Sequence, residues 1–194
     1  MKLEALGLLS AAVLRKSNNM SKVITFSRVF PAYHPKAGQR TYFVEKFLKA
    51  NNVNWFKDYY FPMLCENNPH LKASDCSEFM KTFNDGIREK KLHTIRNGNR
   101  WKVGDKFSPR VWSGKPYQSK QIVFAPDTEI KQIFDFEIAN NEIYINGQSS
   151  SFENLDVAIN DGLDYKDLLA WFKFPKPFKG QIICWSDAVS YGCR

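Results

Sequence analysis

The spacing of apolar positions predicts that the first half of the chain forms one strand followed by helices. Residues 22–30, KVITFSRVF, are β-branched and aromatic with partial alternation, which is typical of a strand. Residues 41–50 carry apolar side chains at helical spacing and predict a helix. Residues 53–64 are rich in aromatic side chains and contain Pro62, so they fit either a second helix or an irregular packing segment.

Another helix is predicted over residues 75–89, with Ser74 or Asp75 as its N-terminal cap. Its apolar face would consist of Phe79, Met80, Phe83 and Ile87. The helix would lead directly into a basic segment of the chain.

The second half of the chain predicts short strands separated by turns. Turn signals occur at Asn97-Gly98 and at Val103-Gly104-Asp105, and Pro109 predicts an edge strand or a bulge. Helices are predicted at 152–160 and at 165–172, the second with Asp164 as its cap. We expect strands at residues 92–95, 107–112, 120–125, 129–139, 142–145 and 180–185.

This order of elements predicts an α+β fold. Short strands at close spacing, with helices before them and before the last strand, favour a small mixed β-barrel with helices on its rim. We expect a single domain over residues 20–194. Residues 1–19 carry Glu4 and end near Arg15 and Lys16, which does not fit a signal peptide. We expect them to be an upstream extension or a short amphipathic helix outside the main fold.

Composition narrows the class of protein. The net charge of +8 fits either a generally basic surface or a protein that binds a polyanion such as nucleic acid. The four cysteines form no CxxC pair and the three histidines are not at zinc-ligand spacing, so we expect free thiols, no metal and no cofactor. No apolar window reaches the roughly 18 residues of a membrane span, and we expect a cytoplasmic protein.

Four motifs give the chain a family resemblance. They are ITF at 24–26, KLHTIR at 91–96, KVGD at 102–105 and DGLDYKDLLAWF at 161–172. In this order and spacing they resemble the ASCH family of PUA-like β-barrels, and within it the small proteins that hydrolyse N4-acetylcytidine. Residues from about 31 to 87 exceed the family's usual linker, and we interpret them as an inserted helical segment.

The resemblance also implies an active site. In the amidohydrolase members a lysine accepts a proton, a threonine three residues later is the nucleophile, and a glutamate donates a proton. These roles fall on Lys91, Thr94 and Asp161, the last one methylene shorter than glutamate, and Glu153 is a possible substitute for it. In an ideal strand residues 91 and 94 point to opposite faces, so the chain must bend between them if they are to converge. The alternative is that Lys91 is a solvated cation and Thr94 an ordinary strand residue.

Basic and aromatic residues suggest how a nucleobase or nucleic acid could be bound. Trp112, Lys115 and Tyr117 combine rings for stacking with a cation for phosphate. The arginines with the same expected role are Arg28, Arg96 and Arg100. The open alternatives are solvated charges for the arginines, and core or rim packing for Trp112 and Tyr117. We therefore expect binding of a nucleobase, modified nucleoside or nucleic acid, with either amide hydrolysis or binding alone.

Overall fold

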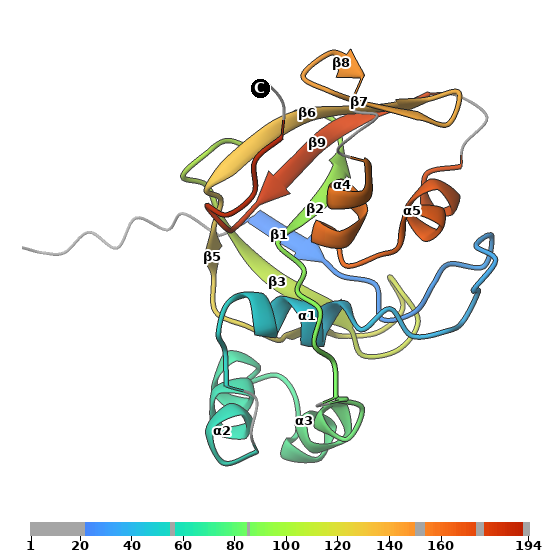
Figure 1. The fold of residues 1–194 in the computed structure, drawn as a ribbon. Helices are drawn as coiled ribbons and strands as arrows, with labels where there is room; N and C mark the ends of the chain where they lie inside the picture. Colours follow the sequence, from blue (N-terminus) through green and yellow to red (C-terminus); the bar gives the residue numbers. More distant parts are fainter. Residues whose placement is uncertain (1–21, 55–56, 85, 150–153, 174–176, 192–194) are drawn as a thin grey trace, which may run out of the picture.

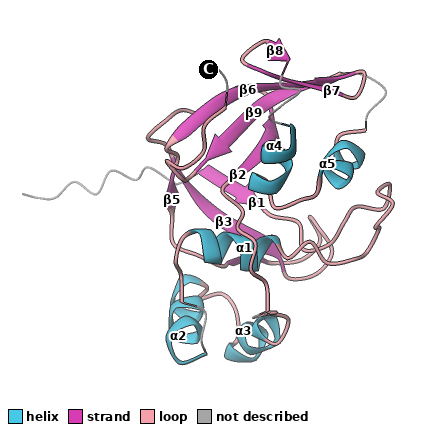
Figure 2. Ribbon diagram, viewed as in Figure 1, coloured by secondary structure: helices cyan, strands magenta, loops and turns pink. Residues whose placement is uncertain are grey.

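The computed structural model describes residues 22–54, 57–84, 86–149, 154–173 and 177–191. It is a mixed α+β structure whose strands form two sheets (Figures 1 and 2). The predicted extension at 1–19, and Glu153, lie outside the described residues.

The first sheet, sheet A, is built around a central strand. The strand β3 (Lys106–Trp112) pairs in parallel with β1 (Lys22–Thr25). On its other side it pairs with β4 (Gln121–Val123) and β5 (Thr128–Glu129). Pro109 therefore lies in a central strand, so the edge-strand alternative of the prediction is wrong. It is tolerated there because its antiparallel partner changes at this point from β5, which pairs at residues 106–107, to β4, which pairs at 110–112.

The second sheet, sheet C, has the order β2-β9-β6-β7-β8. Its central strand β9 pairs antiparallel with β2 and β6. The turn between β6 and β7 has Asn140 and Asn141 at φ values of 52° and 63°, the two left-handed positions of a tight hairpin. The strands are β2 (His93–Asn97), β6 (Gln132–Ala139), β7 (Glu142–Ile145), β8 (Gln148–Ser149) and β9 (Phe178–Cys184).

The two sheets do not close into the predicted barrel. At one corner β5 continues almost directly into β6, and the backbone N–H of Lys131 donates to the Cys184 carbonyl. Between β1 and β2, however, no strand pairing is present in the described residues. A side chain links them instead, because Arg96 donates a 2.8 Å hydrogen bond to the Thr25 carbonyl.

The predicted helical segment contains three helices, which hang below the sheets in Figure 1. They are α1 (Phe43–Ala50), α2 (Lys57–Asn67) and α3 (Ala73–Met80). The aromatic stretch is thus a helix that includes Pro62. The third helix is shorter than predicted and ends at Met80, where the Thr82 N–H and hydroxyl both donate to the Phe79 carbonyl in a local turn that competes with helix.

Two further helices cover one face of sheet C (Figure 1). They are α4 (Asn154–Asn160) and α5 (Tyr165–Trp171), and Asp164 caps α5 by accepting a 2.8 Å hydrogen bond from the Asp167 N–H, as predicted. Phe136 of β6 packs on Phe172, just after α5. On the opposite face Gln181 holds the backbone of Trp101, whose ring packs on Phe107 in sheet A.

Candidate functional site

A pocket of about 570 Å³ lies where β1, β3 and the helical segment meet. This volume is within the roughly 300–1,000 Å³ typical of small-molecule sites. Among the described residues that line it, two are charged, Arg28 and Arg40. The described residues that line it are Thr25, Phe26, Ser27, Arg28, Val29, Arg40, Thr82, Trp112, Ser113, Gly114, Pro116 and Tyr117.

Arg28 supplies a cation to the pocket without a fixed anionic partner. Its guanidinium lies 5.4 Å from the ring centroid of Phe79 in α3, which orients it by a cation–π contact. It makes no hydrogen bond with any described residue. Burial lowers the pKa of Arg28, the neighbouring Arg40 lowers it further and Glu45 opposes both, yet a guanidinium remains charged in proteins.

Arg40 is held in place by the helical segment. Its guanidinium donates to the Thr82 carbonyl and forms a 2.8 Å ion pair with Glu45, a buried carboxylate at the start of α1. The guanidinium carbon of Arg40 also lies 4.9 Å from the centroid of the Tyr42 ring, in a cation–π contact. The helical segment therefore contributes one wall of the pocket.

The opposite wall is the loop after β3. The Ser119 hydroxyl accepts a hydrogen bond from the Gly114 N–H and donates one to the Lys115 carbonyl, so the loop is closed on itself. Tyr117 is 89% exposed and lies 5.3 Å, between centroids, from the ring of Trp112. This pair presents aromatic surface to solvent, and Lys115 lies between two residues that line the pocket.

The two other predicted arginines behave differently. Arg96 adjoins the pocket, since it donates to the Thr25 carbonyl and lies 5.9 Å from the Phe26 ring. Burial lowers its pKa, Asp161 opposes this and Arg100 adds to it. Arg100 lies away from the pocket, where its guanidinium is 5.0 Å from the Trp101 ring.

Lys91 and Asp161 form a buried ion pair, with 2.7 Å between Lys91 Nζ and Asp161 Oδ1. Asp161 follows α4 and precedes Gly162, whose φ of +79° ends the helix in a left-handed turn. The ammonium also donates to the Asp161 carbonyl and lies 4.1 Å from the centroid of the Phe43 ring. Because Lys91 is only 1% exposed, the solvated-cation alternative is wrong.

The electrostatics favour this ion pair near neutral pH. Burial lowers the pKa of Lys91 to about 8, although Asp161 opposes the shift. Burial raises the pKa of Asp161, but the neighbouring ammonium of Lys91 outweighs it and the pKa lies below its usual value. In this state the ammonium cannot accept a proton and the carboxylate cannot donate one.

Thr94 faces away from the ion pair. In β2, His93 and Thr94 alternate, and His93 Nδ1 lies 3.5 Å from Asp161 Oδ1. Thr94 pairs with Ile183, on the face of sheet C that is directed toward sheet A. No hydrogen bond joins the Thr94 hydroxyl to Lys91 or Asp161, all three being described residues. The structure therefore brings together the predicted base and acid but not the nucleophile.

His93 is an unpredicted member of this buried cluster. Its ring is 0% exposed and has no hydrogen bond to any described residue. Burial lowers its pKa, with Asp161 opposing, so it is neutral at physiological pH. Its sequence position in a strand gave no signal of contact with the turn after α4.

The pocket and the ion pair are linked through the aromatic core. Phe26, in the pocket wall, packs on Trp185, and the Trp185 indole donates a 2.9 Å hydrogen bond to the Lys91 carbonyl. Of the residues predicted to bind a nucleobase or phosphate, Arg28, Trp112 and Tyr117 line this pocket. The prediction did not include Arg40 and Thr82, because both belong to the segment that was interpreted as an insertion.

Comparisons with known proteins add no family. No family model matches the chain, and neither a curated protein nor a solved structure matches it. Across the described residues, no group of three or more His, Cys, Asp or Glu could hold a metal ion. No helix in the described ranges is long and apolar enough to cross a membrane.

Proposed function

We propose that this protein is an ASCH-type, PUA-like protein that binds a nucleobase, in a nucleoside or a nucleic acid strand, in the pocket between β1, β3 and the helical segment. The observation that carries the proposal is the lining of this pocket. It combines Trp112 and Tyr117 with Arg28 and Arg40 and includes no carboxylate among the described residues.

The chemistry of the lining matches the requirements of this ligand. An unpaired base offers a flat π-face, and stacking on an aromatic side chain contributes about 1–3 kcal/mol per base. The two arginines and the nearby Lys115 provide positive charge that would attract the phosphate backbone of a nucleic acid strand. The net charge of +8 agrees with an anionic partner.

The test is titration with short single-stranded RNA and DNA over a series of salt concentrations. We expect affinity to fall steeply as salt rises, and Trp112→Ala to lower the affinity roughly 5- to 100-fold, the equivalent of one stacked base. Lys115→Ala should weaken binding less and reduce the salt dependence. Undetectable binding to both nucleic acids and to nucleosides would refute the proposal.

Hydrolysis of an N4-acylcytidine amide is a second candidate, favoured by the Lys91 pKa of about 8. A lysine with a lowered pKa can serve as a base for a nearby hydroxyl. The reaction would need a proton on Asp161 and a shift of β2 that brings Thr94 to Lys91. Release of cytidine from N4-acetylcytidine, abolished in Thr94→Ala and in Lys91→Ala, would support it, and its absence in the wild-type protein would exclude it.

A further inference from the structure

The two pocket arginines differ in whether their guanidinium groups already have hydrogen-bond acceptors. This difference indicates which of them could bind an anionic group of a ligand. Arg40 already has acceptors, since it is bound to Glu45 and to the Thr82 carbonyl. Arg28 is also positively charged and is half-buried, but its guanidinium has no hydrogen-bond acceptor among the described residues. A partly buried guanidinium that faces a pocket and has no acceptor is suited to binding an anion.

The surroundings of Arg28 indicate that this is not an ordinary surface charge. Its guanidinium is oriented by the Phe79 ring, and Arg40 lies close enough to lower its pKa. The nearby carboxylate, Glu45, is already paired with Arg40. The guanidinium of Arg28 is thus surrounded by groups that are held in place, and its N–H donors are available to a ligand in the pocket.

The aromatic pair lies on the other wall of the same pocket. Trp112 and Tyr117 come from the loop after β3, whereas Phe79 and Thr82 belong to the helical segment. A ligand that uses both walls must therefore carry a flat ring and an anionic group. Planar, bidentate recognition of phosphate is characteristic of arginine.

We propose that Arg28, oriented by Phe79 of the helical segment, is the phosphate-binding residue of the pocket and makes the site selective for nucleotides over neutral nucleosides. This inference rests on the proposed function and narrows it to a ligand that bears a phosphate. Free mononucleotides and nucleotides within a strand share this chemistry.

The experiment is isothermal titration calorimetry with four nucleosides, their 5′- and 3′-monophosphates, inorganic phosphate and a five-nucleotide single-stranded RNA. We expect at least one monophosphate to bind ten-fold or more tightly than its nucleoside. Arg28→Gln should remove that difference while changing the nucleoside affinity less than about two-fold. Tighter binding of the RNA than of any monophosphate identifies a strand as the source of the nucleotide.

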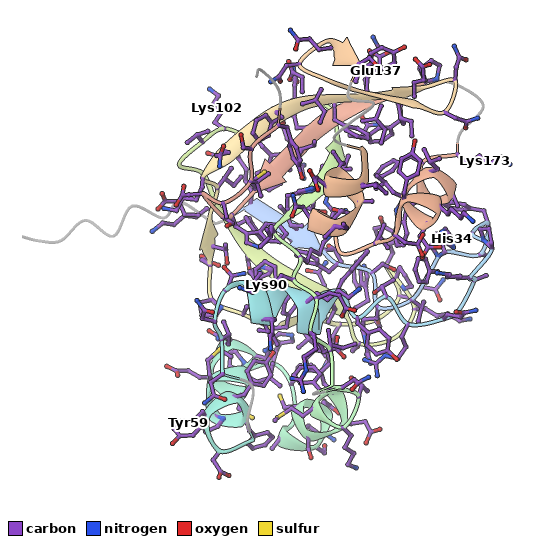
Figure 3. The ribbon with its side chains drawn as sticks, viewed as in Figure 1. His34, Tyr59, Lys90, Lys102, Glu137 and Lys173 are labelled. Carbon is purple, nitrogen blue, oxygen red and sulfur yellow. The ribbon has the colours of Figure 1, made fainter. Side chains whose placement is uncertain are left out.

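Two further variants make the result specific. Arg28→Lys keeps the charge without the planar fork, and we expect part of the selectivity to return. Lys102→Gln removes an exposed cation in the turn before β3 (Figure 3). Lys102 is not among the described residues that line the pocket, so this change should leave selectivity unchanged. If Arg28→Gln proves unfolded by circular dichroism, Arg28→Lys and competition by inorganic phosphate in the wild-type protein still decide the matter.

The outcomes separate the two proposals. Equal affinity for nucleosides and monophosphates would overturn the phosphate site but leave nucleobase binding intact. A preference for monophosphates that persists in Arg28→Gln, or that is lost equally in Lys102→Gln, would also overturn it. No binding of nucleosides, monophosphates or RNA would overturn the proposed function itself.

Discussion

The ion pair between Lys91 and Asp161 places two charges in the interior of the protein. Both groups are almost fully removed from water, and each depends on the other for compensation of its charge. Such a pair contributes little net stability compared with apolar residues of the same size, but loss of one member leaves an uncompensated charge. Its two members therefore cannot be varied independently.

Asp161→Asn should lower the free energy of unfolding by about 3–5 kcal/mol at pH 7. The ammonium of Lys91 would then remain buried without a counter-ion. The double variant Lys91→Met/Asp161→Asn removes both charges, and we expect it to recover most of the loss. Urea unfolding followed by fluorescence measures both. A single variant as stable as the wild type would show that Lys91 can reach solvent.

The pKa of Lys91 also predicts how stability depends on pH. In the folded protein it is about 8, below the ordinary value of 10.5, so between these values the unfolded chain binds more protons. Stability should therefore rise with pH across this interval, by about 3 kcal/mol. Thermal unfolding from pH 7 to 10.5, with the double variant as reference, isolates this contribution. A constant difference between the two proteins would contradict the lowered pKa.

The sequence could indicate Lys91 and Asp161, but not their contact. Their spacing of 70 residues is bridged by the tertiary structure, which sets the turn after α4 against the start of β2. Thr94 shows the limit of the same motif. Strand alternation, which requires no tertiary information, correctly separates it from Lys91, whereas the family resemblance implies that they meet.

At the scale of elements, the position of Asp161 depends on how α4 ends. Gly162 has a φ of +79°, and a Cβ there would lie 3.1 Å from the Lys46 Cδ and 3.5 Å from the Lys91 Cβ. Lys46 in turn donates a 2.8 Å hydrogen bond to the Gly162 carbonyl. The turn is therefore fixed by both its backbone conformation and its packing.

Gly162→Ala should reduce the free energy of unfolding by about 1–3 kcal/mol through backbone strain, with an additional loss from contact with Lys46. Gly98→Ala is a matched control, because Gly98 has the same φ of +79° and an added Cβ there would have nothing within 4 Å. The difference between the two variants, measured by denaturant unfolding, reports the packing at Gly162. Equal losses would mean that the turn can move away from α1.

Most elements could be predicted from local pattern, and the exceptions have local or tertiary causes. The hairpin at Asn140-Asn141 and the cap at Asp164 follow from residue chemistry within a few positions. The end of α3 at Met80 was missed because its apolar spacing continues through Phe83, which packs on Phe79 and Tyr60 from outside the helix. The open edge between β1 and β2 was missed because pairing of distant strands leaves no local signal.

At the scale of the whole molecule, the helical segment is tied to sheet A by buried polar groups. Asn68, just after α2, donates to the Val123 carbonyl and accepts from the Val123 N–H, at 2.9 and 2.8 Å. It therefore occupies the free edge of β4 as a neighbouring strand would. The Tyr60 hydroxyl adds a hydrogen bond to the Phe124 carbonyl. Tyr59, by contrast, is exposed on the outer side of α2 (Figure 3).

These ties predict that the helical segment and the sheets unfold together, and that Asn68 contributes to their coupling. Asn68→Ala should lower the free energy of unfolding by about 1–3 kcal/mol, because two partly buried backbone groups of Val123 lose their partner. Asn67→Ala, at the exposed neighbouring position, should cost less than about 0.5 kcal/mol.

Far-ultraviolet circular dichroism and tryptophan fluorescence should give one coincident transition in the wild type. If the two signals separate in the wild type, or if Asn68→Ala proves as mild as Asn67→Ala, the hydrogen bonds of Asn68 do not couple the segment to the sheets. The pocket formed between them would then lack the polar support that we infer from Asn68.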